Sequence, residues 1–492
     1  MVVGAALAGT IAACSDDGAD PTARPDDLPS AVSSSPPPVV RPAGPAADLS
    51  TVLEGGNGVF VGEARKLTLP SDWVEEERVA AGTATSYQPV ELPADGRYTL
   101  SEGPTADYRT RILVRRPKEQ RSFNGTVVVE WLNVSGGVDG NPGFSLMGDE
   151  LIRGGYAWVG VSAQFIGVEG GPVAVSVPAS EGIAGKGLRN FDPPRYATLH
   201  HPGDAFSYDT YTQVARALRQ GDGLGDLRPD RVLAIGQSQS AAMLVTYANG
   251  VQPQAQQFDG FLIHSRGAPA APLGATNAGV DVIAAFFGAP TTVRDDLEVP
   301  VLVLQTETDV LQLGSVTARQ GDTDHLRLWE IAGAAHADRT LMGATADTID
   351  CGGPVNDGPQ RFIARAALRA LDRWARTGEA PPHADRLSVE GDPPEARRDN
   401  DGIILGGIRT PVVDAPVVAL SGQPRPASSA ICFLSGATDP ISPERLTARY
   451  GSRTAYVDAF TRATDAAITA GFVLPQDRDQ LLAAAQPDLI PG

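Results

Sequence analysis

The sequence predicts an α/β fold in which helices cover both faces of a mostly parallel central sheet. Short runs of apolar, β-branched residues alternate with amphipathic segments along most of the 492 residues. Such alternation is typical of strand–helix–strand units, which build parallel sheets. Several of the apolar runs end in serine, carboxylate or histidine residues. In a parallel sheet these side chains would meet at one edge, so this edge is the expected site.

The individual elements follow from the spacing of apolar residues. Strands are expected at 97–101, 108–116, 126–132, 156–162, 232–235 and 259–264, and within 299–310 and 325–338. Helices are expected where apolar residues recur three and four positions apart. They lie near 146–153, at 205–219, 241–248 and 358–378, and in a final pair at 442–464 and 474–486. Gly378, directly after one of these helices, is a typical C-cap.

Two long insertions interrupt the alternation, at 163–203 and 266–297. Long irregular segments in compact domains are usually functional or disordered, and both leave the sheet on the side of the expected site. We therefore expect them to form a cap over a pocket. The main domain is expected to span 49–378, with a C-terminal extension, 379–492, packed on it.

Composition excludes several classes of function. The formal net charge is −19, so the phosphates of nucleic acid and of anionic lipid headgroups would be repelled. The sequence has no CxxC spacing, no phosphate-binding loop and no dinucleotide fingerprint. No metal or cofactor is therefore expected, and no nucleic-acid partner.

The segment RVLAIGQSQSAAM, residues 231–243, has the pattern of a nucleophile elbow. Gly236 and Ser240 flank Ser238, and such a tight turn requires small residues at both flanking positions. Ser240 replaces the usual second glycine, but the strand before the turn and the helix after it supply the required context. Ser238 is therefore predicted to be a nucleophile rather than a residue of an ordinary turn.

Asp309 and His336 follow later strands and complete the chain order of a Ser–Asp–His triad. A serine needs an imidazole to take its proton, and the imidazole needs a carboxylate to orient it. Glu307, two positions earlier, competes with Asp309 for the acid role. His336 is preferred by position over the other five histidines, which are His200, His201, His264, His325 and His383.

Acyl transfer also requires N–H donors for the developing oxyanion. The backbone N–H of Gln239, the residue after the nucleophile, is the first expected donor. The second is expected from the loop after 126–132, through the main chain of Asn133 or Val134, with Asn133 preferred. The alternative is that this glycine-containing loop merely makes a turn.

Seven segments resemble one protein family: EWLNVSGG (130–137), YAWVGVSAQFIGV (156–168), HPGDAFSYD (201–209), GQSQSA (236–241), QTETDV (305–310), AGAAHAD (332–338) and GGIRTP (406–411). They look like the bacterial α/β-hydrolase-domain proteins common in actinobacteria, over most of residues 50–460. The resemblance implies the α/β-hydrolase fold and catalytic roles for Ser238, Asp309 and His336. It implies no particular substrate.

The N-terminus resembles an exported lipoprotein. Residues 1–13 are apolar and uncharged like the core of a secretory signal, although no Lys or Arg precedes them. They end in IAAC, which resembles a lipobox with Cys14 as the residue that receives lipid. Residues 15–48 are rich in Pro, Ser and Ala, as in a disordered tether. We expect anchoring at the outer face of the cytoplasmic membrane, with no other membrane contact.

Export would leave two cysteines, Cys351 and Cys432, in an oxidising compartment. They either form a disulfide or remain two separate buried thiols, since geometry is not visible in sequence.

Together these features predict a serine hydrolase that cleaves a small carboxylic ester through an acyl-enzyme. One alternative is an acyltransferase, in which an alcohol replaces water on the same triad. The other is a non-catalytic surface lipoprotein that uses the fold to bind a ligand.

Overall fold

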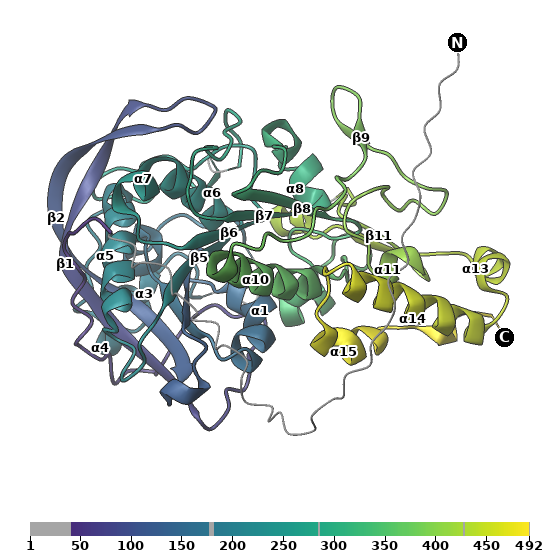
Figure 1. The fold of residues 1–492 in the computed structure, drawn as a ribbon, viewed down its shortest axis with the longest axis horizontal. Helices are drawn as coiled ribbons and strands as arrows, with labels where there is room; N and C mark the ends of the chain where they lie inside the picture. Colours follow the sequence, from purple (N-terminus) through teal and green to yellow (C-terminus); the bar gives the residue numbers. More distant parts are fainter. Residues whose placement is uncertain (1–40, 177–181, 284–285, 427–428, 492) are drawn as a thin grey trace, which may run out of the picture. The chain divides into compact units, whose positions relative to one another are not determined.

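The computed structural model describes residues 41–176, 182–283, 286–426 and 429–491, which are built around an eight-stranded sheet (Figure 1). The strand order is β1-β2-β4-β3-β5-β6-β7-β8. The strands are β1 (Trp73–Glu91), β2 (Thr99–Pro117), β3 (Thr126–Trp131), β4 (Ala157–Val161), β5 (Arg231–Gln237), β6 (Gly260–His264), β7 (Val301–Thr306) and β8 (Leu326–Ile331). All neighbours from β4 to β8 pair in parallel, whereas β1 and β2 are antiparallel. The predicted mostly parallel sheet is confirmed.

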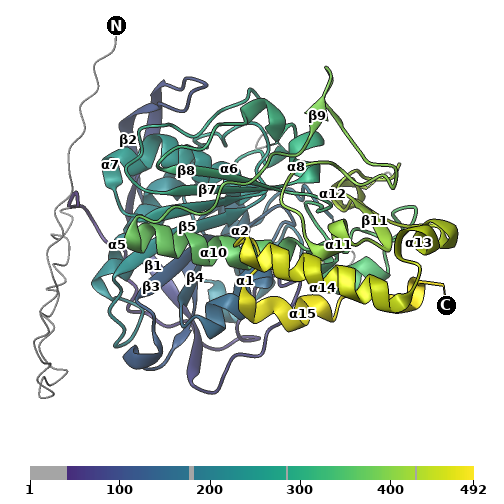
Figure 2. The same cartoon turned by 45° about the vertical axis from the view of Figure 1, so that its right-hand side comes forward.

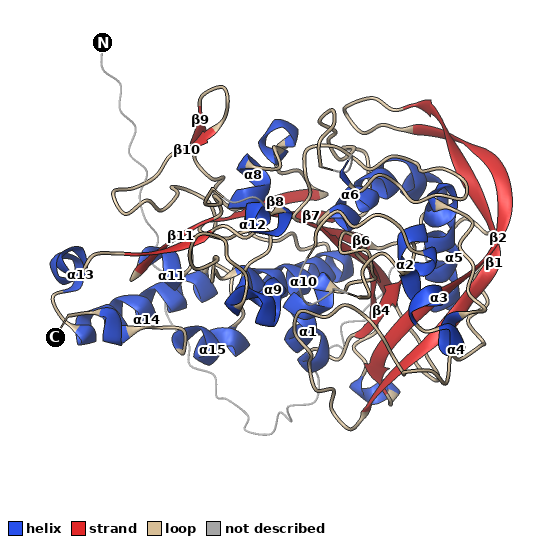
Figure 3. Cartoon of the chain, turned by 180° about the vertical axis from the view of Figure 1, so that it is seen from behind, coloured by secondary structure: helices blue, strands red, loops and turns tan. Residues whose placement is uncertain are grey.

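β1 was the main element that sequence patterning missed, whereas β2 was predicted in two pieces. β1 and β2 are 19 residues each and pair from Trp73 opposite Pro117 to Glu91 opposite Thr99 (Figure 3). The sequence predicts only two short strands, at 97–101 and 108–116. β1 is rich in Glu and Ala and contains a Gly and a Pro, and these residues disfavour strands when they are judged one at a time. The long antiparallel ladder overrides this weak local preference.

Helices cover both faces of the sheet, as predicted. Alternate residues of β5 face opposite ways, because side chains alternate along a strand. Leu233 packs in the core with α1 (Pro142–Arg153) and α10 (Gln360–Thr377). Val232 and Ala234 pack in the core with α5 (Ser207–Gln220) and α6 (Gln239–Thr246). β5, the strand that leads to Ser238, is thus buried between two apolar layers.

The other helices have four or five residues, apart from α13 and α14 of the extension. They are α2 (Phe165–Glu169), α3 (Gly187–Phe191), α4 (Pro193–Tyr196), α7 (Gln252–Ala255), α8 (Glu307–Leu311) and α9 (Arg339–Met342), followed in the extension by α11 (Pro411–Asp414), α12 (Ala430–Leu434), α13 (Pro443–Tyr450), α14 (Arg453–Thr469) and α15 (Arg478–Leu482). Two small hairpins complete the extension: β9 (Val389–Glu390) with β10 (Glu395–Ala396), and β11 (Val418–Ser421) with β12 (Ala437–Pro440).

The C-terminal extension packs on the edge of the sheet at β8. Ile408 pairs with Ile331 in parallel, donating its N–H to the carbonyl oxygen of Glu330 at 2.7 Å. Figure 2 shows α11, α14 and α15 lying together in this extension. The helix expected at 442–464 is interrupted, because Gly451 ends α13 in the left-handed conformation and the side chain of Ser452 caps α14.

The predicted tether, residues 15–48, overlaps the start of the folded unit. Ala47 and Leu49 are buried in the main core, and the N–H of Ala47 donates to the carbonyl oxygen of Gln213 at 3.0 Å. Residues 41–48 therefore belong to the folded unit, which begins at Arg41. The expected signal segment, Cys14 and the rest of the tether lie outside the described residues. In the part of the chain that the structure describes, no helix has the length and hydropathy needed to cross a membrane.

Candidate active site

Ser238 occupies the sharp turn between β5 and α6. Its backbone angles are φ 66° and ψ −127°, a conformation that L-residues rarely adopt and that is typical of a nucleophile elbow. A Cβ atom on Gly236 would lie 2.8 Å from the carbonyl oxygen of Ser240, so the turn excludes a side chain there. The N–H of Ser238 donates to the carbonyl oxygen of His264, at 2.9 Å, which holds the turn against β6.

Ser238, His336 and Asp309 form one chain of hydrogen bonds. The Oγ of Ser238 lies 2.8 Å from Nε2 of His336, and Nδ1 of His336 lies 2.6 Å from Oδ1 of Asp309. These residues follow β5, β8 and β7, whose carboxyl ends lie at the same edge of the parallel sheet. All three side chains are buried. The arrangement is that of a serine nucleophile with an oriented base.

The Asp309 carboxylate is held by a capping box at the start of α8. The N–H of Thr306 donates to Oδ2 of Asp309 at 2.6 Å, and the N–H of Asp309 donates to Oγ1 of Thr306 at 3.3 Å. The hydroxyl of the neighbouring Thr308 accepts from the N–H of His336 at 3.2 Å. Both threonines were overlooked in the sequence, although the T-x-x-D spacing from Thr306 to Asp309 is a recognisable cap signature.

Glu307, the competing acid, points to the C-terminal extension. Its Oε1 forms an ion pair with Arg398 and accepts from the hydroxyl of Ser421 at 3.2 Å. It makes no hydrogen bond to His336. The geometry therefore favours Asp309 for the acid role.

The other histidines have different environments. His264 is buried at the end of β6, where burial lowers its pKa to about 4, so the ring is neutral near neutral pH. His201 is buried, with Nε2 lying 3.0 Å from the carbonyl oxygen of Ala163. His383 is exposed and pairs with Asp322. Among the six histidine rings, which all lie in the described ranges, only that of His336 hydrogen-bonds to Ser238.

The preferred second oxyanion donor requires correction. The N–H of Asn133 donates to the carbonyl oxygen of Gly140 at 2.9 Å, so it is not available to a substrate. The side chain of Asn133 instead donates to the carbonyl oxygen of Gln237 at 3.0 Å and ties this loop to β5. The next N–H, that of Val134, has no acceptor among the described residues. Gln239 is the first residue of α6, where a helix leaves its N–H without an intrahelical acceptor.

Ser238 and His336 line a pocket of about 430 Å³. Its walls also come from residues 60–64, from the first insertion at Val175 and Ile183, and from α9 and α12. No described residue of the second insertion lines it, although the ring of Phe286 lies edge-on to the His336 imidazole with centroids 6.2 Å apart. Val175 and Ile183 of the first insertion thus form part of the pocket wall, whereas the second insertion packs beside the His336 ring through Phe286. The cap expected from the two insertions stays a prediction.

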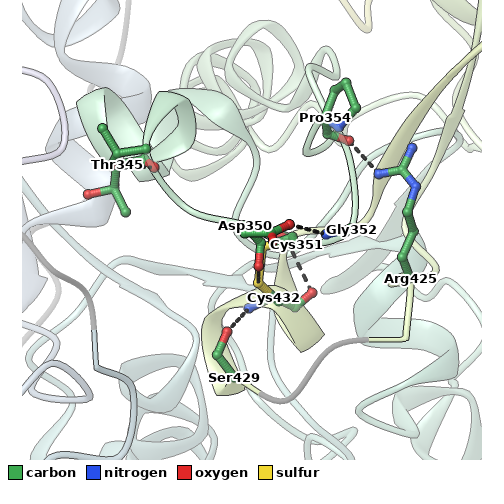
Figure 4. Close-up of a disulfide and its surroundings, with 10 residues drawn as sticks. Thr345, Asp350, Cys351, Gly352, Pro354, Arg425, Ser429 and Cys432 are labelled. Atoms are coloured by element: carbon green, nitrogen blue, oxygen red, sulfur yellow. Dashed lines mark hydrogen bonds between the residues drawn. A yellow bond between two sulfur atoms is a disulfide. The ribbon is translucent and has the colours of Figure 1, made fainter.

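Cys351 and Cys432 are joined by a disulfide, the first of the two alternatives left open by the sequence (Figure 4). The bond links the segment after α9 to α12 of the extension. Within the described ranges, no three His, Cys, Asp or Glu side chains are grouped closely enough to bind a metal ion.

Comparison with known proteins identifies the family. Residues 42–483 match the alpha/beta hydrolase domain family. The chain belongs to this family. Among solved structures similar to this α/β hydrolase are a Klebsiella pneumoniae protein assigned as a dienelactone hydrolase (16% identity, 61% of this chain and 99% of that chain, TM-score 0.31) and carboxyl esterase 2 of Tuber melanosporum (10% identity, 63% and 90%, TM-score 0.30). A search of curated proteins found no match.

Asp338, two residues after His336, is expected to make the stability of this α/β hydrolase depend on pH. Burial raises the pKa of its carboxyl group to about 7. The folded state therefore retains a proton that the unfolded chain releases above its ordinary pKa near 4, so stability falls as pH rises from about 4 to 7. In Asp338→Asn the free energy of unfolding should fall less over this pH range, by about 2–4 kcal/mol.

The measurement is urea unfolding of both proteins at pH 5 and pH 8. In the native protein the Asp338 side chain caps α9 by accepting the N–H of Leu341, and Asn can still accept this N–H. Glu130, whose pKa burial also raises to about 7, is present in both proteins and contributes equally. If the free energy of unfolding changed equally in the two proteins between pH 5 and pH 8, an ionisation of Asp338 in this range would be ruled out.

Proposed function

We propose that this α/β hydrolase is a serine esterase that cleaves a carboxylic ester through an acyl-enzyme. The hydrogen-bonded chain from Ser238 through His336 to Asp309 carries the proposal. Ser238 Oγ attacks the ester carbonyl carbon while Nε2 of His336 takes the hydroxyl proton. His336 then gives this proton to the departing alcohol, which leaves the acyl group on Ser238. Water attacks the acyl-enzyme with His336 again as base, which releases the acid and restores Ser238.

The oxyanion of each tetrahedral intermediate is stabilised by two backbone N–H groups, those of Gln239 and Val134. Both groups belong to segments held by other contacts, since α6 is buried and the Asn133 side chain ties its loop to β5. Preorganised donors of this kind need no rearrangement during the reaction.

The uncharged character of the pocket supports a neutral ester as substrate. Glu63 is the only carboxylate among the described residues that line it, and it is already paired with Arg115 and with the amide of Asn141 at 2.8 Å. No Lys or Arg side chain lines the pocket among the described residues. A charged substrate would enter such a site without a partner.

Turnover of nitrophenyl esters by the purified protein tests the proposal, with and without an added alcohol. Release of free acid without the alcohol supports hydrolysis. Formation of a new ester only when the alcohol is present would instead support an acyltransferase. A fluorophosphonate label should map to Ser238; absence of both turnover and labelling would leave only a binding role for the fold.

We further propose that the protein is exported and lipid-anchored through Cys14. In its own host it should partition into detergent and yield a blocked N-terminus, because a diacylglyceryl group buries two chains at about 0.8 kcal/mol per CH₂. Cys14→Ser should become soluble or remain unprocessed. Recovery of the native protein in the cytosol with Met1 still attached would contradict export.

A further inference from the structure

One side of the catalytic pocket is built from two segments that the disulfide joins. Leu341, Met342 and Thr345 come from α9 and the turn that follows it, and Ile431 and Leu434 come from α12. The disulfide connects Cys432, between the two lining residues of α12, to Cys351, a few residues beyond the turn at Thr345 (Figure 4).

α12 has only five residues and depends on outside contacts for its position. An isolated helix of this length is unstable in water. Its carbonyl at Leu434 accepts from the N–H of Ala337 at 2.9 Å, and Ala337 directly follows His336. The next carbonyl, that of Ser435, accepts from the N–H of Asn356 at 2.9 Å. The bond to Ala337 therefore holds α12 against the loop that carries His336, and the bond to Asn356 and the disulfide hold it against residues 351–356.

The surface that α12 presents to the pocket is apolar. Ile431 and Leu434 are 7% and 9% exposed and belong to a cluster with Val134, Ala337 and Met342. This cluster includes the residue assigned as oxyanion donor and the residue after the base. A group that occupies the pocket beside the reacting carbonyl therefore meets Ile431 and Leu434.

We propose that Ile431 and Leu434, held in place by the Cys351–Cys432 disulfide, determine substrate specificity and select esters with an uncharged, apolar acyl chain of several carbons. The inference rests on the proposed esterase function and adds the substrate class. The 430 Å³ pocket is larger than an acetyl group requires and falls within the usual range of small-molecule sites. The C-terminal extension thus supplies an apolar wall of the pocket beside the triad.

The test compares kcat/KM for nitrophenyl acetate, butyrate, hexanoate and octanoate. The native protein should prefer one of the longer esters over acetate. Leu434→Ala should lower the ratio of the preferred ester to acetate by about tenfold, because a missing methylene contact in an apolar pocket changes discrimination by roughly 10- to 200-fold. Leu434→Met, which conserves most of the volume, should restore most of the ratio.

Phe433→Ala is the matched control, because Phe433 lies on the same helix, is 36% exposed and does not line the pocket. It should leave the ratio unchanged. The double variant Cys351→Ala/Cys432→Ala should lower the ratio as Leu434→Ala does, through the displaced helix, while acetate turnover continues. The ratio of kcat/KM values distinguishes a specificity role from a general loss of folded enzyme. Such a loss would reduce kcat/KM for all esters alike and leave the ratio unchanged.

The outcomes separate the two proposals. A native protein that cleaves no ester contradicts the proposed function. A native protein that cleaves esters but prefers acetate contradicts the inference alone, as does a Leu434→Ala variant with the native ratio.

Discussion

Replacing Ser238 by alanine is expected to reduce ester turnover by roughly 10⁴-fold or more and to abolish fluorophosphonate labelling, since the members of a triad act as a unit. The lost Oγ lies 2.8 Å from Nε2 of His336, the group expected to take its proton. The fold should persist, because the change removes one hydroxyl that is not part of the apolar core. Steady-state kinetics and thermal unfolding of the same preparation measure both effects.

Ser240→Ala is the matched control for this prediction. Ser240 lies two positions away on the same elbow, is fully buried, and its hydroxyl has no hydrogen-bond partner in the described part of the chain. Its loss should leave turnover within about tenfold of the native rate, as for substitutions away from the reacting atoms. Parent-level turnover by Ser238→Ala would place the nucleophile elsewhere.

The strand–turn–helix segment around Ser238 was predictable because its geometry is local. A turn between a buried strand and a helix admits only small flanking residues, so Gly236 and Ser240 leave a visible pattern around Ser238. The structure adds the positive φ of Ser238, which follows from that same turn. Strand, turn and helix lie within about twenty residues, so no distant contact was needed to recognise them.

The pocket walls could not be predicted, because they join segments that are distant in sequence. Ile431 and Leu434 are ordinary apolar residues of a short helix, and nothing in their neighbourhood indicates a role beside Ser238. The same reason explains the error at Asn133. The N–H of Asn133 donates to the carbonyl oxygen of Gly140 across an irregular loop. Such a backbone hydrogen bond does not depend on residue type, so the sequence does not indicate it.

The acid assignment falls between these cases. Counting from the end of the strand favours Asp309 over Glu307, but both residues follow the same strand and both are buried. The decisive contact of Glu307 is with Arg398, in the extension and 91 positions further along the chain. Only the folded structure shows that the two neighbouring carboxylates serve different partners.

Asp309→Asn is expected to lower kcat by about 10³- to 10⁴-fold, because an amide opposite Nδ1 favours the wrong histidine tautomer and cannot stabilise the imidazolium. Oδ1 of Asp309 lies 2.6 Å from that nitrogen. Asn can still accept the N–H of Thr306 and preserve the cap of α8, so the loss should fall on kcat rather than on folding. Nitrophenyl ester kinetics together with thermal unfolding separate these two effects.

Glu307→Gln provides the matched comparison, with the opposite pattern. It should keep kcat within about tenfold of the native value, because its carboxylate does not contact His336. It should instead lower stability by about 1–3 kcal/mol, because Arg398 loses the charge of its partner and keeps only hydrogen bonds to neutral oxygens, among them the carbonyl oxygen of Gly402. Equal losses of kcat in the two variants would leave the acid unassigned, and a greater loss at Glu307 would transfer the role to that residue. The two carboxylates are two positions apart, so each variant removes one negative charge from nearly the same place. A difference in kcat between the variants therefore reports contact with His336 rather than local charge.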